Sequence, residues 1–124
     1  MPLPSDPNAF AQEWITAWNT HDLPRVLSHY SQNLEFESPF ISRVLGDGSS
    51  DVSNRLIGKE AVAGYWSQAL KRFPDLRFEL RQVLPGAHSL CILYKSVQNL
   101  SAAELFWFDG DGLVCRAAAH YATG

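Results

Sequence analysis

Apolar residues recur at helical spacing near the start of the chain. From Phe10 to Trp18 they fall at i, i+4, i+7 and i+8, which is one face of a helix. This helix should begin near Pro7, where the missing N–H of a proline costs nothing, with Ser5 or Asp6 as its N-cap. The residues of the predicted buried face are Phe10, Trp14, Ala17 and Trp18.

Two further segments predict helices. The stretch "HDLPRVLSHY" predicts a second, shorter helix capped by Asp22. The stretch "GKEAVAGYWSQALKRFP" has the clearest helical period, and Pro74 ends it. The residues predicted to face inward are Leu23, Val26, Leu27 and Tyr30 in the shorter helix and Val62, Tyr65, Trp66, Ala69, Leu70 and Phe73 in the longer one.

Alternating polarity predicts strands elsewhere. In "NLEFESPF", Leu34, Phe36 and Ser38 share one face while Glu35 and Glu37 share the other, which is typical of a half-buried strand. After the longer helix the pattern predicts only strands, with a turn at the Pro-Gly pair between the first two. These strands cover about residues 76–84, 89–98, 102–109 and 113–122.

Residues 41–57, "ISRVLGDGSSDVSNRLI", form the least regular stretch. Their glycines and serines predict a mobile loop with a short strand at either end. Loops of this length are often functional or simply disordered, and both interpretations stay open. Helices first and a meander of strands afterwards indicate one α+β domain over residues 1–124, in which helices pack on one side of a curved antiparallel sheet.

The last two strands form a predicted hairpin whose register decides which side chains face the helices. If Gly110-Asp111 is a two-residue turn, the opposed pairs are Phe108 with Leu113, Phe106 with Cys115, Glu104 with Ala117 and Ala102 with Ala119. One face then carries Glu104, Phe106, Phe108, Leu113, Cys115, Ala117, Ala119 and Tyr121. The outer face carries Leu105, Trp107, Val114, Arg116, Ala118 and His120. A loop of three or five residues would exchange the two faces.

Glu104 lies within the apolar run "AAELFWFDGDGLVCRAAAHY", on the more apolar face by this count. A carboxyl group in an apolar pocket has a raised pKa, because burial penalises its charged form. Such a group can act as a general acid or base near neutral pH, or donate a hydrogen bond while protonated. The alternative is a surface carboxylate that reaches water or pairs with Arg116 or Lys95. The sequence leaves both interpretations open.

Composition and charge narrow the possible classes of function. The chain has 124 residues, 46% of them hydrophobic, and a net charge of −3. Its lysines and arginines are scattered and build no basic face, so nucleic acid is not an expected partner. Neither a signal peptide nor an apolar run of membrane length is visible, so we expect a cytoplasmic location and no membrane contact. The four histidines lack metal-ligand spacing, and no metal site is expected.

Three stretches that together span most of the chain carry a resemblance: "FAQEWITAWNTHDLPRVLSHYSQNLEFESPF", "GKEAVAGYWSQALKRFPDLRFEL" and "ELFWFDGDGLVCR". They resemble the nuclear transport factor 2-like superfamily, specifically its SnoaL-like and ketosteroid isomerase-like branch. The resemblance implies a cone-shaped curved sheet wrapped around the N-terminal helices, a deep apolar pocket and, commonly, a dimer. The group includes isomerases, polyketide cyclases, dehydratases, epoxide hydrolases and non-catalytic adaptors, so the fold alone does not choose a reaction.

The resemblance also bears on the site. The general base of ketosteroid isomerases is an Asp before a proline, and the matching residue is Ser38; their oxyanion-hole tyrosine matches Trp14. Their second oxyanion donor, a protonated Asp, matches Glu104. Because two of the three groups are replaced, we do not expect the usual ketosteroid isomerisation. The pocket expected from the resemblance and the residue pattern is lined by Trp14, Trp18, Phe36, Ser38, Tyr65, Tyr94, Phe106, Phe108, Ala117, Ala119 and Tyr121, with the 41–57 loop near its mouth as a lid.

Two functions follow as hypotheses. The first is a small-molecule enzyme of the isomerase, cyclase or dehydratase type. It would act on an apolar carbonyl-bearing ligand with Glu104 as the pocket acid, with Trp14 and either Tyr94 or Tyr65 as auxiliary donors, and no cofactor is implied. The second is a non-catalytic dimeric module that binds a ligand or serves as an adaptor.

The outer face of the predicted sheet is too apolar to be left in water, which suggests a partner. We expect a homodimer through this face, and a different protein docked there is the alternative. The residues expected at this interface are Leu105, Trp107, Arg116, Ala118 and His120.

Overall fold

The computed structural model describes residues 3–46 and 53–123. Its helices α1 (Pro7–Asn19), α2 (Leu23–Leu27) and α4 (Lys59–Arg72) lie where the apolar spacing predicted them. Asp6 caps α1 by accepting a hydrogen bond from the N–H of Ala9 at 3.0 Å. Asp22 caps α2 in the same way, at 3.2 Å from the N–H of Arg25.

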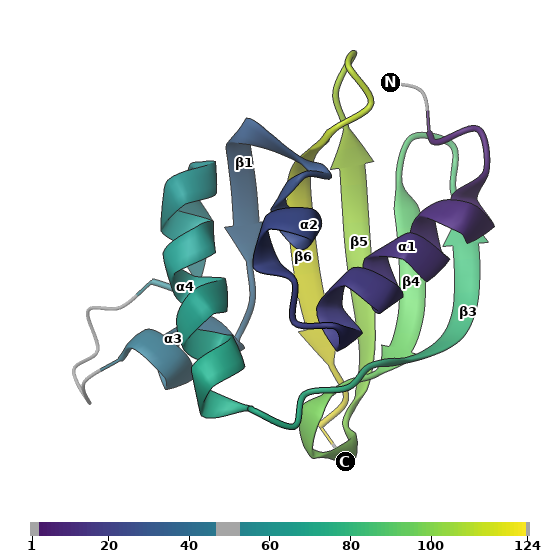
Figure 1. Cartoon of the computed structure of the whole chain (residues 1–124). Coiled ribbons are helices and arrows are strands. Elements are labelled where there is room, and N and C mark those ends of the chain that lie inside the picture. Colours follow the sequence, from purple (N-terminus) through teal and green to yellow (C-terminus); the bar gives the residue numbers. More distant parts are fainter. Residues whose placement is uncertain (1–2, 47–52, 124) are drawn as a thin grey trace.

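Six strands form one sheet in the order β2-β1-β6-β5-β4-β3 (Figure 1). They are β1 (Tyr30–Glu37), β2 (Arg55–Ile57), β3 (Glu79–Pro85), β4 (Leu90–Lys95), β5 (Ser101–Phe108) and β6 (Val114–Tyr121). Neighbouring strands are antiparallel except β1 and β6, which are parallel. This exception to the expected antiparallel sheet is possible because the chain between β1 and β6 serves as the long connection that parallel strands require.

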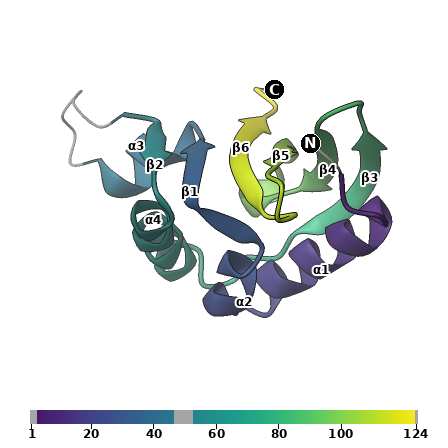
Figure 2. The same cartoon turned by 90° about the horizontal axis from the view of Figure 1, so that it is seen from above.

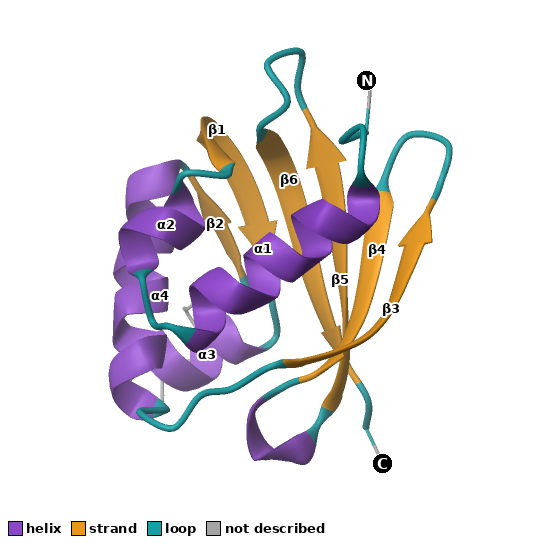
Figure 3. Cartoon of the chain, turned by 45° about the vertical axis from the view of Figure 1, so that its right-hand side comes forward, coloured by secondary structure: helices purple, strands orange, loops and turns teal. Residues whose placement is uncertain are grey.

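The sheet is curved, and α1, α2 and α4 lie against its concave side (Figure 2). The opposite side carries no helix among the residues described (Figure 3). The predicted α+β class, with N-terminal helices on one face of a curved sheet, is thereby confirmed. The core lies between the two layers and is rich in aromatic rings, such as Trp14 on α1, Trp66 on α4 and Phe106 on β5.

The stretch predicted as the 41–57 loop is more regular than expected. Its first part is a helix, α3 (Phe40–Leu45), whereas a short strand was predicted there; a strand does form near its other end, as β2. The helix forms because Phe40 and Ile41 are buried and because α3 packs against α4, a gain that local composition does not reveal. Residues 47–52, on which the lid expectation also depends, lie outside the described residues.

The β5–β6 hairpin has a different register from the predicted one. Its turn is closed by the hydrogen bond from the N–H of Asp109 to the carbonyl of Leu113, so the loop holds three residues, not two. A three-residue loop alone would exchange the inner and outer faces predicted for β6. A β-bulge at Cys115 adds one residue to β6, so from Arg116 onward each residue lies on its predicted face. As a result Glu104 pairs with Ala119, where the prediction paired it with Ala117.

The bulge also changes which residues near the turn face the core. Val114, predicted on the outer face, is fully buried, whereas Leu113 and Cys115, predicted to face inward, are only half-buried. Beyond the bulge the predicted faces hold. Ala117 and Ala119 accompany Glu104 and Phe106 toward the helices.

The boundaries of three strands also differ slightly from the predictions. Tyr30 begins β1, whereas the pattern placed it on the second helix. The strand β3 begins at Glu79, a few residues later than predicted, and β4 ends at Lys95. The chain turns there because a short 3₁₀ segment, η1 (Val97–Asn99), follows β4.

Candidate active-site cavity around Glu104

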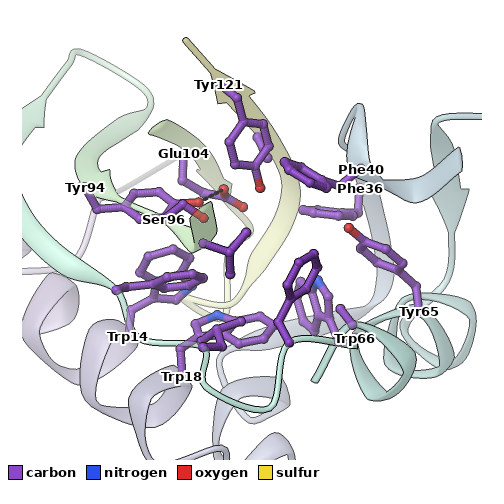
Figure 4. Close-up of a pocket in the computed structure, with 16 residues that line it drawn as sticks. Trp14, Trp18, Phe36, Phe40, Tyr65, Trp66, Tyr94, Ser96, Glu104 and Tyr121 are labelled. Atoms are coloured by element: carbon purple, nitrogen blue, oxygen red, sulfur yellow. Dashed lines mark hydrogen bonds between the residues drawn. The ribbon is translucent and has the colours of Figure 1, made fainter. Parts of the chain in front are cut away.

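A cavity of about 50 Å³ lies between the helices and the concave side of the sheet. Aromatic side chains from both layers surround it (Figure 4). Its lining residues are Trp14, Trp18, Phe36, Phe40, Tyr65, Trp66, Ala69, Phe73, Leu76, Phe78, Tyr94, Ser96, Val97, Glu104, Ala119 and Tyr121. The volume is enough for a few water molecules or a small chemical group, whereas drug-sized ligands fill roughly 300–1,000 Å³.

Glu104 is the acidic residue of this cavity. It lies on β5, and only 3% of its surface is exposed. Its Oε1 accepts a hydrogen bond from the hydroxyl of Tyr94, on the adjacent strand β4, at 3.2 Å (Figure 4). The alternative, a surface carboxylate that reaches water or pairs with Arg116 or Lys95, is wrong because Glu104 is buried. Lys95 instead pairs with Glu79, and Arg116 pairs with Glu37.

Burial raises the pKa of Glu104 from 4.5 to about 8, because the charged form would lose its hydration. The hydrogen bond from Tyr94 acts in the opposite direction and is the smaller effect on this pKa. Most Glu104 side chains are therefore protonated at neutral pH, and the group can donate a proton or a hydrogen bond there.

The cavity also holds tyrosine hydroxyls. Burial raises the pKa of Tyr65 to about 12 and raises the pKa of Tyr121 further, and the nearby Glu104 charge contributes to both shifts. Both hydroxyls consequently stay protonated in the pH range of most enzymes. In Figure 4 the Tyr121 hydroxyl points toward the same space as the Glu104 carboxyl group. These groups are hydrogen-bond donors that could face a ligand oxygen.

The two tryptophans of α1 differ in the use of their indole N–H groups. The Nε1 of Trp14 donates to the hydroxyl of Tyr30 at 2.9 Å in the buried core, so the expectation that it serves as an auxiliary donor in the pocket is wrong. The Nε1 of Trp18 is buried and has no hydrogen-bond partner among the described residues. A buried donor without a partner is unusual and costs free energy, and the Trp18 side chain that carries it lines the cavity.

Most predicted pocket residues meet at this cavity, and some do not. Those that line it are Glu104, Trp14, Trp18, Phe36, Tyr65, Tyr94, Ala119 and Tyr121. Ser38, Phe106, Phe108 and Ala117 are buried but do not line it. Phe106 and Phe108 instead pack edge-to-face against Phe10 of α1, and Ala117 lies opposite Phe106. The hydroxyl of Ser38 accepts a hydrogen bond from the N–H of Phe40 in the turn before α3.

Several lining residues were not predicted as part of the site. Trp66, Ala69 and Phe73 were recognised on the inward face of the longer helix, but that face was interpreted only as core. Their helical period was the signal that could have found them. Phe40, Leu76, Phe78, Ser96 and Val97 lie in or beside irregular segments, where no periodic signal exists.

The described residues hold neither a cluster of metal ligands nor a helix that could span a membrane. Residues 3–46 and 53–123 contain no group of three or more His, Cys, Asp or Glu side chains that could hold a metal ion. Within these same ranges, the helices are too short or too polar to cross a membrane.

The SnoaL-like domain family matches residues 11–122, which is nearly the whole sequence. The chain belongs to the SnoaL-like family. A crystal structure of a SnoaL-like protein of unknown function from Burkholderia thailandensis E264 is 43% identical, with a TM-score of 0.86, over 98% of this chain and 99% of that one. The resemblance seen in the sequence is confirmed.

More distant relatives share the fold of this SnoaL-like protein. A nuclear transport factor 2-like protein of unknown function from Cytophaga hutchinsonii has a TM-score of 0.70 at 14% identity, over 98% of this chain and 95% of that one. The epoxide hydrolase/cyclase-like enzyme SalBIII, which has a role in pyran ring formation in the polyether salinomycin, has a TM-score of 0.70 at 12% identity, over 94% and 90% of the two chains. No match was found among curated proteins.

Proposed function

We propose that this SnoaL-like protein binds a small apolar molecule through a carbonyl oxygen and moves a proton on it with Glu104. The observation that carries the proposal is a carboxyl group buried in an aromatic cavity, with a pKa raised to about 8. A proton-transfer group works best when its pKa lies near the working pH. Burial has brought the pKa of Glu104 close to neutral pH.

The donors around Glu104 suit a carbonyl oxygen. Hydrogen bonds from the hydroxyls of Tyr65 and Tyr121 and from the indole of Trp18 would stabilise the negative charge that forms when a proton leaves the adjacent carbon. The ionised form of Glu104, about one tenth of the molecules at pH 7 for this pKa, accepts that proton. In a ligand with a carbon–carbon double bond next to that carbon, the acid so formed returns the proton to the far end of the double bond, which shifts the double bond into conjugation with the carbonyl and leaves Glu104 unchanged.

Deuterium exchange tests this chemistry without a known substrate. In D₂O, the wild-type protein should accelerate exchange of the protons beside the carbonyl group of acetone and of butan-2-one, small ketones that suit the volume of the cavity, measured by NMR. Glu104→Gln, which keeps the volume of the side chain, should slow this exchange about a hundredfold. Glu37→Gln is the matched control, because it removes a surface carboxylate on β1. Equal exchange by the wild type and Glu104→Gln would refute the proposal.

A binding function without catalysis is the second candidate. The observation in its favour is that Glu104 is the single carboxyl group, and no His or Lys accompanies it, among the described residues that line the cavity. Many proton-transfer sites use a second acid or base. A protein of this kind would bind the same ketones, seen as a rise in its melting temperature, and would leave their exchange rate unchanged.

A further inference from the structure

A second hollow adjoins the Glu104 cavity. It has a volume of about 390 Å³ and lies between residues 72–77, at the end of α4 and beyond, and residues 95–99, at the end of β4 and beyond. We call this hollow the vestibule. It shares four lining residues with the Glu104 cavity, namely Phe73, Leu76, Ser96 and Val97. The two hollows therefore adjoin at these four residues, and a ligand that occupied both would pass between them.

The vestibule is lined by more positive than negative side chains. Arg72, Arg77 and Lys95 line it, and Asp75 is its one acidic residue among those described. The whole chain has the opposite balance, with a net charge of −3 and ten lysines and arginines in all. Three of those ten positive residues thus gather at a hollow that opens beside an apolar cavity.

These three cationic side chains differ in the partners that they have within the protein. An Nη of Arg72 donates to the carbonyl of Arg43 at 3.0 Å, and the Nζ of Lys95 lies 3.6 Å from a carboxylate oxygen of Glu79. Arg77 is exposed and has no ion-pair partner within the described part of the chain. Arg77 is therefore the side chain most available to pair with an anion in the vestibule.

The wall of the vestibule at η1 has an unusual backbone. Gln98 and Asn99 are consecutive residues with φ of 56° and 61°, in the left-handed region that non-glycine residues rarely adopt. Such geometry costs free energy and persists where the surrounding structure holds it, often at binding sites. The residue before this pair, Val97, lines both hollows.

We propose that the vestibule binds a carboxylate of the ligand whose apolar body occupies the Glu104 cavity. The ligand class is then an apolar carbonyl compound that also bears an acidic group. The inference rests on the proposed function, because the inner cavity supplies the apolar part of the binding. The cations are exposed to water and would hold a small free anion only weakly, so the apolar body and the carboxylate must belong to one molecule.

A matched pair of probes tests this inference. We would measure by calorimetry at pH 7 the binding of hexanoate and of hexan-1-ol, whose narrow alkyl chains suit the small inner cavity and which differ in the charged end group. The acid should bind more tightly than the alcohol. Arg77→Gln should weaken binding of the acid about two- to fivefold, the range of an exposed charge pair, and leave binding of the alcohol unchanged. Arg81→Gln is the matched control, because it removes the same charge on β3 outside the vestibule.

A second variant distinguishes loss of the anion site from misfolding of the protein. Asp75→Asn removes the one acidic residue of the vestibule and should tighten binding of the acid, which a damaged protein would not do. Equal affinities for acid and alcohol, no binding of either, or a preference for the acid that survives Arg77→Gln would each overturn the vestibule site. None of these results depends on deuterium exchange at Glu104, so a failure of this inference can be distinguished from a failure of the proposed proton transfer.

Discussion

Glu104 shows how burial changes the chemistry of a single residue. The same side chain on the outer face of β5 would be an ordinary ionised carboxylate. On the concave face it is enclosed by rings, its hydrogen bond comes from the neutral hydroxyl of Tyr94, and its pKa rises to about 8. The protein therefore keeps a neutral acid where an apolar side chain would stabilise the core more, which is typical of a functional group.

The raised pKa of Glu104 makes a prediction about stability. Between pH 4.5 and about 8 the folded protein holds a proton on Glu104 that the unfolded chain has lost, so the free energy of unfolding falls as pH rises through this range. The loss should be of order 4 kcal/mol by the top of the range, at about 1.4 kcal/mol per pKa unit. Urea unfolding of wild type and Glu104→Gln across this range measures it. The variant should lack this part of the pH dependence, and parallel curves would contradict the prediction.

At the scale of elements, an ion pair holds the short helix α2 against α1. Glu13 of α1 accepts two hydrogen bonds from Arg25, one of them from Nε at 2.7 Å, and lies 3.2 Å from the ring of His29. Arg25 is the main cause of the lowered pKa of Glu13, about 2, and His29 acts in the same direction. A helix of five residues is too short to be stable alone, so this contact matters for its position.

We expect Glu13→Gln to lower stability at pH 7 by about 0.5 kcal/mol, a small value because both side chains are partly exposed to water. Since folding lowers the pKa of Glu13, its contribution exists above pH 4.5 and disappears as pH falls toward 2. Thermal unfolding at pH 7 and near pH 3 measures the difference. Glu35→Gln, which breaks the more exposed pair with Arg55, should have a smaller effect, and a larger one would count against this account.

The β5–β6 turn depends on one glycine. Gly112 has a φ of +78°, and the carboxylate of Asp109 accepts hydrogen bonds from the N–H groups of Asp111 and Leu113. Gly112→Ala should therefore lower the free energy of unfolding by about 1 kcal/mol, measured in urea. Gly110→Ala is the control, because an added Cβ meets nothing within 4 Å and its φ is not in this region. Equal effects of the two substitutions would refute the assigned turn.

At the scale of the molecule, the outer side of the sheet remains without a helix among the described residues. Leu105 and Trp107 are half-buried there, and the guanidinium of Arg116 lies 4.7 Å from the ring centre of Trp107. The expectation of a homodimer through this face stays a prediction. Such a face is where a second copy of the chain would bury apolar surface.

Sedimentation velocity tests the homodimer. The wild-type chain should sediment as a dimer, and Trp107→Glu should sediment as a monomer, because a charge in the centre of an interface is costly to bury. Leu45→Glu is the control, since it places the same charge on an exposed residue of α3. A wild-type monomer would exclude the homodimer, and a dimer unaffected by Trp107→Glu would assign it to another surface.

Local pattern was enough to predict most elements of this protein. The helical period of α1 and α4, their proline and aspartate boundaries, and the alternation along β1 depend on residues close together in sequence. The side of the sheet on which Glu104 lies was also predicted. That success depended on two errors that cancel, since the three-residue loop and the bulge at Cys115 each shift the hairpin register by one residue.

Only the tertiary structure decided the site itself. Helix α3 forms where composition predicts a loop, because α4 covers its apolar face. The hydrogen bond of Trp14 to Tyr30 depends on distant segments, as does the fact that Trp18 finds no partner within residues 3–46 and 53–123. The raised pKa of Glu104 and the meeting of residues 72–77 with 95–99 at the vestibule depend on distant segments as well. The sequence by itself determined most of the elements and most of their buried faces, because those follow from periodicity and local hydrogen bonds. The cavity and the raised pKa of its acid were decided by packing, because burial is a property of the whole fold.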